Sequence, residues 1–334
     1  MDTIKEKTSR PSLSTMKKSI KHSIALITGA TSGVGYAAGR MLAIEGYRQI
    51  IVTGRSLAQI QETAAQLAAE TKIQVFTPLE LELDSVSSVQ SFLAEHVKRG
   101  QPVDFLLLNA GIMGRKELKL TAAGIEMSSA PLIGHHQLTV GLLRAKLLSP
   151  NARIVIASSE AARGDVPLFS YTDVAAFAAK YFQGDRTAAV EALLHSGPNV
   201  KYQPNRAFAD AKLIGTLWVA ALARRLPSGM AIYAVSPGAA PATNAVRNAG
   251  LLTRLVLIPL TKLIPGMSHT PETAARRYLN ASEFGTDVSG QFFASPPKKL
   301  TGPIEAMRQP HFHDRANQEA AWQAVVKVTG VDLS

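Results

Sequence analysis

The chain has 334 residues and no cysteine, which excludes disulfides, thiolate metal sites and a cysteine nucleophile. Its formal net charge is +11, yet the basic residues are scattered and form no single face or helix that could bind nucleic acid. The charge therefore favours anionic small ligands over a nucleic acid.

The N-terminal stretch differs in composition from the rest of the chain. Residues 1–22 carry six lysine and arginine residues against two acidic ones, and they lack the apolar run of a secretory signal. We expect a disordered basic tail here and a cytoplasmic protein. Residues 23–330 alternate between strand-like and helix-like patterns, which predicts a single domain.

The first strand pattern runs into a glycine-rich turn and then into a helix. Glycines at 29, 33 and 35 permit tight turns and let the backbone approach a ligand closely. The first N–H groups of the following helix form an anion site suited to a dinucleotide pyrophosphate. The cofactor-binding residues predicted in this turn are Gly29, Thr31, Ser32, Gly33, Val34 and Gly35.

The spacing Thr28-Gly29-x-x-x-Gly33-x-Gly35 resembles the short-chain dehydrogenase/reductase family, whose further motifs follow in order to about residue 330. The resemblance implies an α/β fold: a Rossmann-type doubly wound parallel sheet of about seven strands with helices on both faces. It also implies an NAD(P)-dependent oxidoreductase that acts on a CH–OH or C=O group.

The second strand pattern, residues 49–53, ends at Gly54 and is followed by Arg55. Sites that prefer NAD carry an acidic residue at the end of this strand. Here glycine stands in that place, and the Arg55 guanidinium can pair with a 2′-phosphate. The sequence therefore predicts NADP(H) as the cofactor. A third strand is expected over residues 73–76.

Two loops resemble further cofactor contacts of the family. Glu82 and Leu83 stand where an acidic residue and a leucine lie against the adenine, although Asp84 competes with Glu82 for this role. An apolar strand over residues 103–108 follows, as buried parallel strands require. It runs into a turn resembling the one beside the nicotinamide ribose: Asn109, Ala110 and Gly111.

The catalytic groups of the family correspond to a strand end and a helix. The second serine of the pair Ser158-Ser159 is implied to bind the substrate carbonyl. The family's Tyr-x-x-x-Lys motif corresponds to Phe208 and Lys212, which share one helix face because they are four residues apart. In the family the lysine lowers the tyrosine pKa and binds ribose, and the tyrosine transfers the proton. A phenyl ring keeps the packing and loses this chemistry.

A second departure lies in the helix expected over residues 122–147. Pro131 stands where the family carries an asparagine whose carbonyl holds a water beside the lysine. Because proline fixes φ and lacks an N–H, we expect a kink there. His135 and His136 lack partners at metal spacing, so we expect them to pack on the helix and predict no metal site.

Residues 160–205 form an insertion relative to compact family members, with helical patterns over 173–179 and 187–194. Its aromatic residues either build a lid or wall of the substrate pocket or belong to a subdomain that packs on its rim. The aromatic residues that cluster within this insertion are Phe169, Tyr171, Phe177, Tyr181 and Phe182.

The C-terminal third resembles the substrate side of the family. Pro237, Gly238 and Thr243 correspond to a loop that contacts the nicotinamide amide, with Thr243 one place later than usual. The apolar stretch 251–267 is too short and too interrupted to span a bilayer. It favours an apolar substrate, with attachment to a membrane surface as the alternative. The closing helix at 322–330 resembles retinol-dehydrogenase-like members.

Two functions follow from these features. The first is an NADPH-dependent carbonyl reductase for an apolar or aromatic small molecule, weakened by Phe208. The second is a family member that binds the cofactor without ordinary reduction, as a binding module or a non-redox catalyst. Ser159 and Lys212 favour the first, whereas Phe208 and Pro131 favour the second. Family members pair through the helices at 122–147 and 206–226, which implies a homodimer or homotetramer.

Overall fold

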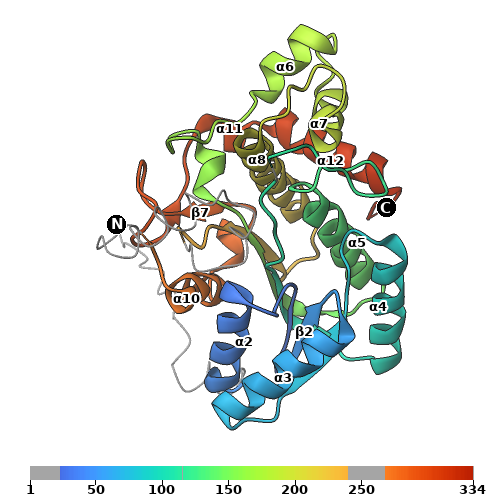
Figure 1. The fold of residues 1–334 in the computed structure, drawn as a ribbon, viewed down its shortest axis with the longest axis vertical. Helices are drawn as coiled ribbons and strands as arrows, with labels where there is room; N and C mark the ends of the chain where they lie inside the picture. Colours follow the sequence, from blue (N-terminus) through green and yellow to red (C-terminus); the bar gives the residue numbers. More distant parts are fainter. Residues whose placement is uncertain (1–22, 115, 240–267, 334) are drawn as a thin grey trace, which may run out of the picture.

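The computed structural model describes residues 23–114, 116–239 and 268–333. In these ranges eight strands form one sheet in the order β3-β2-β1-β4-β5-β6-β7-β8 (Figure 1). The strands are β1 Ile24–Ile27, β2 Gln49–Gly54, β3 Phe76–Glu80, β4 Val103–Leu108, β5 Leu148–Ala157, β6 Ala231–Val235, β7 Phe292–Ala294 and β8 Glu305–Ala306.

Helices cover both faces of the sheet, as a doubly wound fold requires. The helices α2, α3 and α10 lie on one face, and α4, α5, α8 and α12 lie on the other (Figure 1). The bounds of all described helices are α2 Gly33–Glu45, α3 Leu57–Thr71, α4 Val86–Arg99, α5 Ala130–Arg144, α6 Val174–Tyr181, α7 Arg186–His195, α8 Pro204–Ala223, α10 Pro271–Ala281, α11 Pro310–His313 and α12 Arg315–Thr329, with the single-turn helices η1 Glu160–Arg163 and η4 Thr286–Val288.

The first strand of the chain lies inside the sheet, and later strands are added on both sides of it. Strand β1 pairs in parallel with β2 on one side and with β4 on the other. This arrangement creates a topological switch point, and ligands of such sheets bind at the carboxyl ends of the strands there. The fold class expected from the sequence is confirmed. The additional strand is β8, a two-residue edge strand antiparallel to β7.

Strand β1 shows why the central strands are apolar throughout. Its residues are completely buried, and they point alternately into two separate cores. Ile24 and Leu26 pack with the helices of one face, and Ala25 and Ile27 pack with those of the other. Successive side chains of a strand point to opposite faces, so a sheet covered on both faces needs apolar residues at every position.

Two elements differ from expectation. Strand β3 occupies residues 76–80 instead of 73–76; it is the edge strand of the parallel part and includes Pro78, so no apolar run marks it. Helix α5 begins at Ala130, not near 122. Pro131 therefore lies in the first turn, where its missing N–H breaks no helical bond, and the expected kink was wrong.

Within the inserted residues 160–205 the chain forms η1, α6 and α7. Helix α6 lies at the end of the molecule farthest from α2 and α3 (Figure 1).

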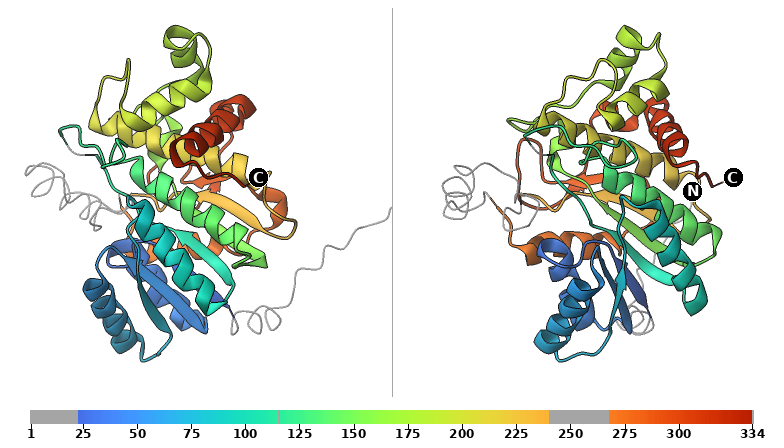
Figure 2. Two further views of the ribbon diagram at one scale, coloured as in Figure 1. Left: turned by 90° about the vertical axis from the view of Figure 1, so that its right-hand side faces the viewer. Right: turned by 45° about the vertical axis from the view of Figure 1, so that its right-hand side comes forward.

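The C-terminal helix α12 runs along α8 and also contacts α7 and α5 (Figure 2). Trp322 of α12 stacks on Trp218 of α8 at a ring separation of 6.4 Å. On α5 and α8 the only exposed residues are Arg144 and Arg206.

Three expectations fall outside the described residues: the basic tail over 1–22, Thr243 and the apolar stretch 251–267. Among the helices that the structure does describe, none is both long enough and apolar enough to cross a membrane.

Candidate active site

The glycine-rich turn after β1 is tightly fitted to the turn after β4. Gly29 and Gly33 have φ values of +66° and +59°, which favour glycine. A Cβ on Gly35 would lie 2.4 Å from the Gly29 oxygen and 2.5 Å from Asn109 Nδ2. Asn109 Nδ2 donates to the carbonyls of Thr28 and Gly29 at 3.0 and 3.1 Å. The two turns therefore form one rigid unit at the switch point.

This unit fits the pyrophosphate of a dinucleotide. Helix α2 begins at Gly33, so its first N–H groups face the turn that also contains Thr31, Ser32 and Val34. Unpaired N–H groups at a helix start bind phosphate, and the absence of Cβ atoms at the glycines leaves room for close approach. These residues lie at one strand–turn–helix junction, as the sequence predicts.

The end of β2 has no room for an acidic side chain. A Cβ on Gly54 would lie 2.8 Å from Cγ2 of Thr31, so a longer side chain would have to displace the Thr31 methyl. Arg55 follows directly and is exposed. Its guanidinium is thus free to approach a phosphate beside the turn.

The loop after β3 is fixed against α5. Gly134 approaches it so closely that a Cβ there would lie 2.1 Å from the carbonyl oxygen of Leu83. The Glu82 N–H donates to Ser88 Oγ at 2.9 Å. Glu82 is half-buried and Asp84 is exposed.

Lys212 lies between the ends of β4 and β5. Its ammonium Nζ donates to the carbonyl of Ala157 at 2.7 Å, and a Cβ on Gly111 would lie 3.4 Å from it. Lys212 is partly buried and has no carboxylate partner among the described residues, and burial lowers its pKa to about 8.

Phe208 lies on the same face of α8 as Lys212. Its ring centre is 5.7 Å from Lys212 Nζ, and the ring of Phe169 lies 6.0 Å away at 59°. The spacing of four residues therefore brings the two side chains together as expected, and no hydroxyl stands on this ring.

The serine pair divides into one inward and one outward residue. Ser158 Oγ lies 2.8 Å from Thr216 Oγ1, inside the protein. Ser159 is the N-cap of η1, and its Oγ accepts the N–H of Ala161 at 3.2 Å. Because this contact uses only a lone pair, the Ser159 hydroxyl retains its proton for donation.

A small cavity joins these elements. Its wall contains Ser158 and Lys212 but neither Ser159 nor Phe208. Ser128 also contributes to the wall, although no motif of the sequence marks it as a site residue. The lining residues are Ala110, Gly111, Ser128, Pro131, Leu132, His135, Ile156, Ala157, Ser158, Ala211, Lys212 and Gly215.

The two histidines of α5 pack in the interior. His135 Nε2 lies 2.9 Å from Thr28 Oγ1, and burial, reinforced by Lys212, lowers the pKa of His135 to about 3. Trp218 Nε1 donates to His136 Nδ1 at 3.0 Å, so His136 Nε2 carries the proton bound to the Val331 carbonyl at 2.7 Å. Within the described ranges no three acidic or histidine side chains gather as metal ligands.

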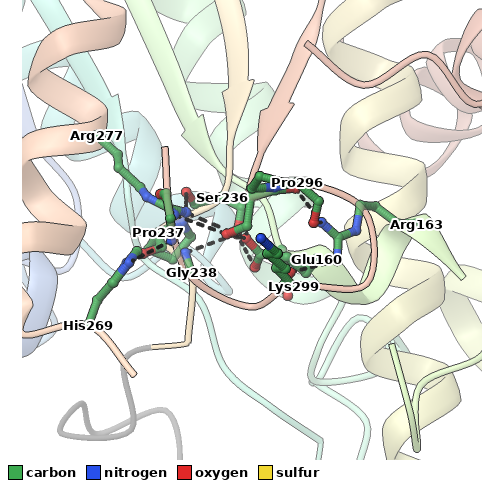
Figure 3. A network of polar contacts seen from close by, with 12 residues as sticks. Glu160, Arg163, Ser236, Pro237, Gly238, His269, Arg277, Pro296 and Lys299 are labelled. Carbon is green, nitrogen blue, oxygen red and sulfur yellow. Dashed lines mark hydrogen bonds and ion pairs between the residues drawn. The ribbon is translucent and has the colours of Figure 1, made fainter. Parts of the chain in front are cut away.

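Sequence reasoning missed a buried polar cluster next to Ser159. Glu160, Arg163 and Arg277 converge there with the loop after β6 (Figure 3). Glu160 follows Ser159 directly, which is a local signal. Arg277 lies 117 residues further along, and no sequence pattern links it to this site.

Comparison with known proteins identifies the family. Residues 23–181 match the model described as short chain dehydrogenase. The chain is 31% identical to short-chain dehydrogenase TIC 32 A, chloroplastic, of Brassica napus over 82% of this chain and 80% of that protein. It is 28% identical to retinol dehydrogenase 13 of Homo sapiens over 86% and 80%. The solved actinorhodin polyketide ketoreductase with NADPH shares the fold, with a TM-score of 0.54, 21% identity and 81% and 94% coverage.

The fold and site thus define an NAD(P)-dependent oxidoreductase acting on CH–OH or C=O groups. The chain belongs to the short-chain dehydrogenase/reductase family, in its retinol-dehydrogenase-like branch.

Proposed function

We propose that this chain is a cytoplasmic, NADPH-dependent oxidoreductase for the carbonyl or alcohol group of an apolar or aromatic small molecule, and that Phe208 makes it a weak carbonyl reductase. The observation that carries this proposal is the placement of the Phe208 ring beside Lys212, where the family motif has a tyrosine, so that the ring next to this lysine carries no hydroxyl. Retinol dehydrogenase 13, a relative named for an apolar alcohol, supports the substrate class. NADPH oxidation with a panel of ketones, aldehydes and quinones tests the proposal.

The cofactor would extend along the carboxyl edge of the sheet and would supply the hydride. The start of α2 would hold the pyrophosphate, and Arg55 the 2′-phosphate. Glu82 and Leu83 would lie against the adenine. The nicotinamide half would meet Asn109, Ala110, Gly111, Lys212, Pro237 and Gly238.

The side chains of the site determine where the proton for the carbonyl oxygen comes from. Ser159 can orient a carbonyl by donating its hydroxyl proton, but a serine hydroxyl is a poor acid. Lys212 holds a proton at Nζ, where it is bound to Ala157. Because Phe208 carries no hydroxyl that could pass a proton from Lys212 to a bound carbonyl, proton delivery should limit the rate.

Arg55→Ala is expected to weaken NADPH binding by about 1–3 kcal/mol, because a charge-assisted phosphate contact is lost. NADH binding should not change, since NADH has no 2′-phosphate. Titration of both cofactors by fluorescence measures the effect. Arg99→Ala, which removes an exposed charge on α4, serves as the control. Equal affinities for NADPH and NADH in the unmodified protein would contradict the assignment.

Phe169 is the aromatic residue of the insertion that we place in the substrate wall, because its ring contacts Phe208. Phe177, Tyr181 and Phe182 pack against one another on and after α6. Phe169→Ala should weaken binding of an aromatic ligand by roughly two- to tenfold, and Tyr181→Ala should leave it unchanged. Calorimetry with NADPH present measures both. If Tyr181→Ala weakened ligand binding and Phe169→Ala did not, α6 would form the substrate wall instead.

In the part of the chain that the structure describes, α5 and α8 offer no free face for pairing, because α4, α7 and α12 cover these helices. We therefore expect a homodimer or homotetramer to form through another surface, with a mass above the 35.6 kDa of one chain in size-exclusion chromatography with light scattering. A dimer that cross-links through residues of α5 or α8 would show that α12 moves away in solution.

A further inference from the structure

The buried polar cluster beside Ser159 holds the loop that follows β6. Glu160 is 3% exposed, and its carboxylate accepts hydrogen bonds from the hydroxyls of Ser236 and Ser295, the latter at 2.8 Å. Ser236 Oγ in turn accepts the N–H of Gly238 at 3.1 Å. A single hydroxyl thus connects the Glu160 carboxylate to the backbone of Gly238.

Arg277 of α10 binds the same groups from a second direction. It is 6% exposed, and Nη1 donates to the Ser236 carbonyl at 3.1 Å and lies 3.5 Å from Glu160 Oε1. Nη2 donates to Ser295 Oγ at 3.0 Å and to the Gly302 carbonyl at 2.5 Å. Only a planar guanidinium presents donors in this forked arrangement.

His269 fixes the middle of the loop. Its Nε2 accepts the Gly302 N–H at 3.3 Å, so Nδ1 carries the proton and donates to the Pro237 carbonyl at 3.1 Å. Gly238 has φ +77°, and a Cβ there would lie 2.6 Å from His269 Nδ1. Figure 3 shows the loop enclosed between His269 and Arg277 on one side and Glu160 on the other.

This arrangement indicates that Glu160 and Arg277 position the loop after β6 more than they stabilise the fold. Burying an ion pair adds little to the free energy of folding, because desolvation offsets the attraction. A fully hydrogen-bonded buried network nevertheless permits only one arrangement of its members. Here Glu160 and Arg277 join the segment after β5, the loop after β6 and helix α10, which are far apart in sequence.

The loop lies at one end of the ligand-binding edge. It follows β6, whereas Arg55 follows β2, and the strand order β2-β1-β4-β5-β6 places the switch point between them. A dinucleotide lies across such a switch point. The two loops therefore face opposite halves of the same ligand.

We infer that the Glu160 and Arg277 pair positions the Ser236–Gly238 loop for the nicotinamide half of the cofactor and has no effect on the adenine half. Both are positioning residues, because they act through the loop and not on the reacting atoms. The inference rests on the proposed function, since it requires a cofactor that spans β2 to β6.

Arg277→Met tests this inference, with Arg276→Met as the matched control on the same helix. Arg276 is exposed and pairs with Glu45. The affinities for NADPH and for 2′,5′-ADP, which represents only the adenine half, are measured by calorimetry. We expect Arg277→Met to weaken NADPH binding by about tenfold and to leave 2′,5′-ADP binding unchanged. Arg276→Met should change neither affinity.

Ser236→Ala provides a second test that keeps both charges. It removes only the hydroxyl between Glu160 and Gly238, and we expect the same selective loss of NADPH affinity. Equal weakening of both ligands, or unchanged NADPH binding in both variants, would overturn the inference. If the unmodified protein binds neither NADPH nor 2′,5′-ADP, the proposed cofactor is wrong, which is a distinct result.

Discussion

Phe208→Tyr is expected to raise carbonyl-reductase turnover by about 10²–10⁴-fold, the usual contribution of a positioned general acid. The ring is already in place, with its centre 5.7 Å from Lys212 Nζ, so the change adds one hydroxyl to an existing arrangement. A cation at this distance stabilises a phenolate and thereby lowers the tyrosine pKa. Because the change adds one hydroxyl on α8 and leaves the glycine-rich turn after β1 unaltered, NADPH affinity should hardly change.

The measurement is NADPH oxidation with apolar ketones, aldehydes and quinones at equal cofactor occupancy. Phe177→Tyr is the matched control, since it adds the same hydroxyl to a ring of α6 that packs against Tyr181 and Phe182, and it should give no gain. If the phenylalanine form is already as fast as the tyrosine form, the proton comes from another group. Conversion of a bound ligand without NADPH consumption by either form would favour a non-redox function.

Lys212→Met should stabilise the fold while removing a proposed cofactor contact. Burial lowers the pKa of Lys212 from 10.5 to about 8, which corresponds to about 3 kcal/mol of unfavourable free energy when the group is charged. Losing the hydrogen bond to Ala157 offsets about 1 kcal/mol. The free energy of unfolding at pH 7 should therefore rise by about 2 kcal/mol.

The pH dependence gives an independent check. Between pH 8 and 10.5 the native state binds fewer protons at Lys212 than the unfolded state, so the stability of the unmodified protein should increase with pH in that range. Lys212→Met should lack this contribution. Urea unfolding at pH 7 and pH 10 measures it, and Lys98→Met, at an exposed site on α4, is the control. A less stable Lys212→Met protein would show that the ammonium stabilises the fold.

The sequence predicts those parts of the site that depend on neighbours in the chain. The turn from β1 into α2 lies within a dozen residues, and the glycine pattern there reflects steric limits that the structure displays directly. The pairing of Phe208 with Lys212 follows from helix geometry alone. Strand β4 matches its expected bounds because the apolar run is buried on both faces.

The remaining features depend on contacts between distant segments. The edge strand β3 has no apolar run, since its residues are half-exposed. Arg277 meets Glu160 only after α10 packs beside the sheet, so its role cannot be predicted from spacing. The coverage of α8 by α12 likewise depends on tertiary packing, in which Trp218 and Trp322 meet from positions more than a hundred residues apart.

The position of α12 over α8 also affects synthesis on the ribosome. Roughly 100 residues separate the end of α8 from the end of α12, and at about 5–20 residues per second their translation takes about 5–20 s. During this interval the α8 surface around Trp218 lacks the helix that later covers it. Until α12 emerges, the apolar residues of this surface stay exposed to water, as the transiently exposed surface of an incompletely folded chain does.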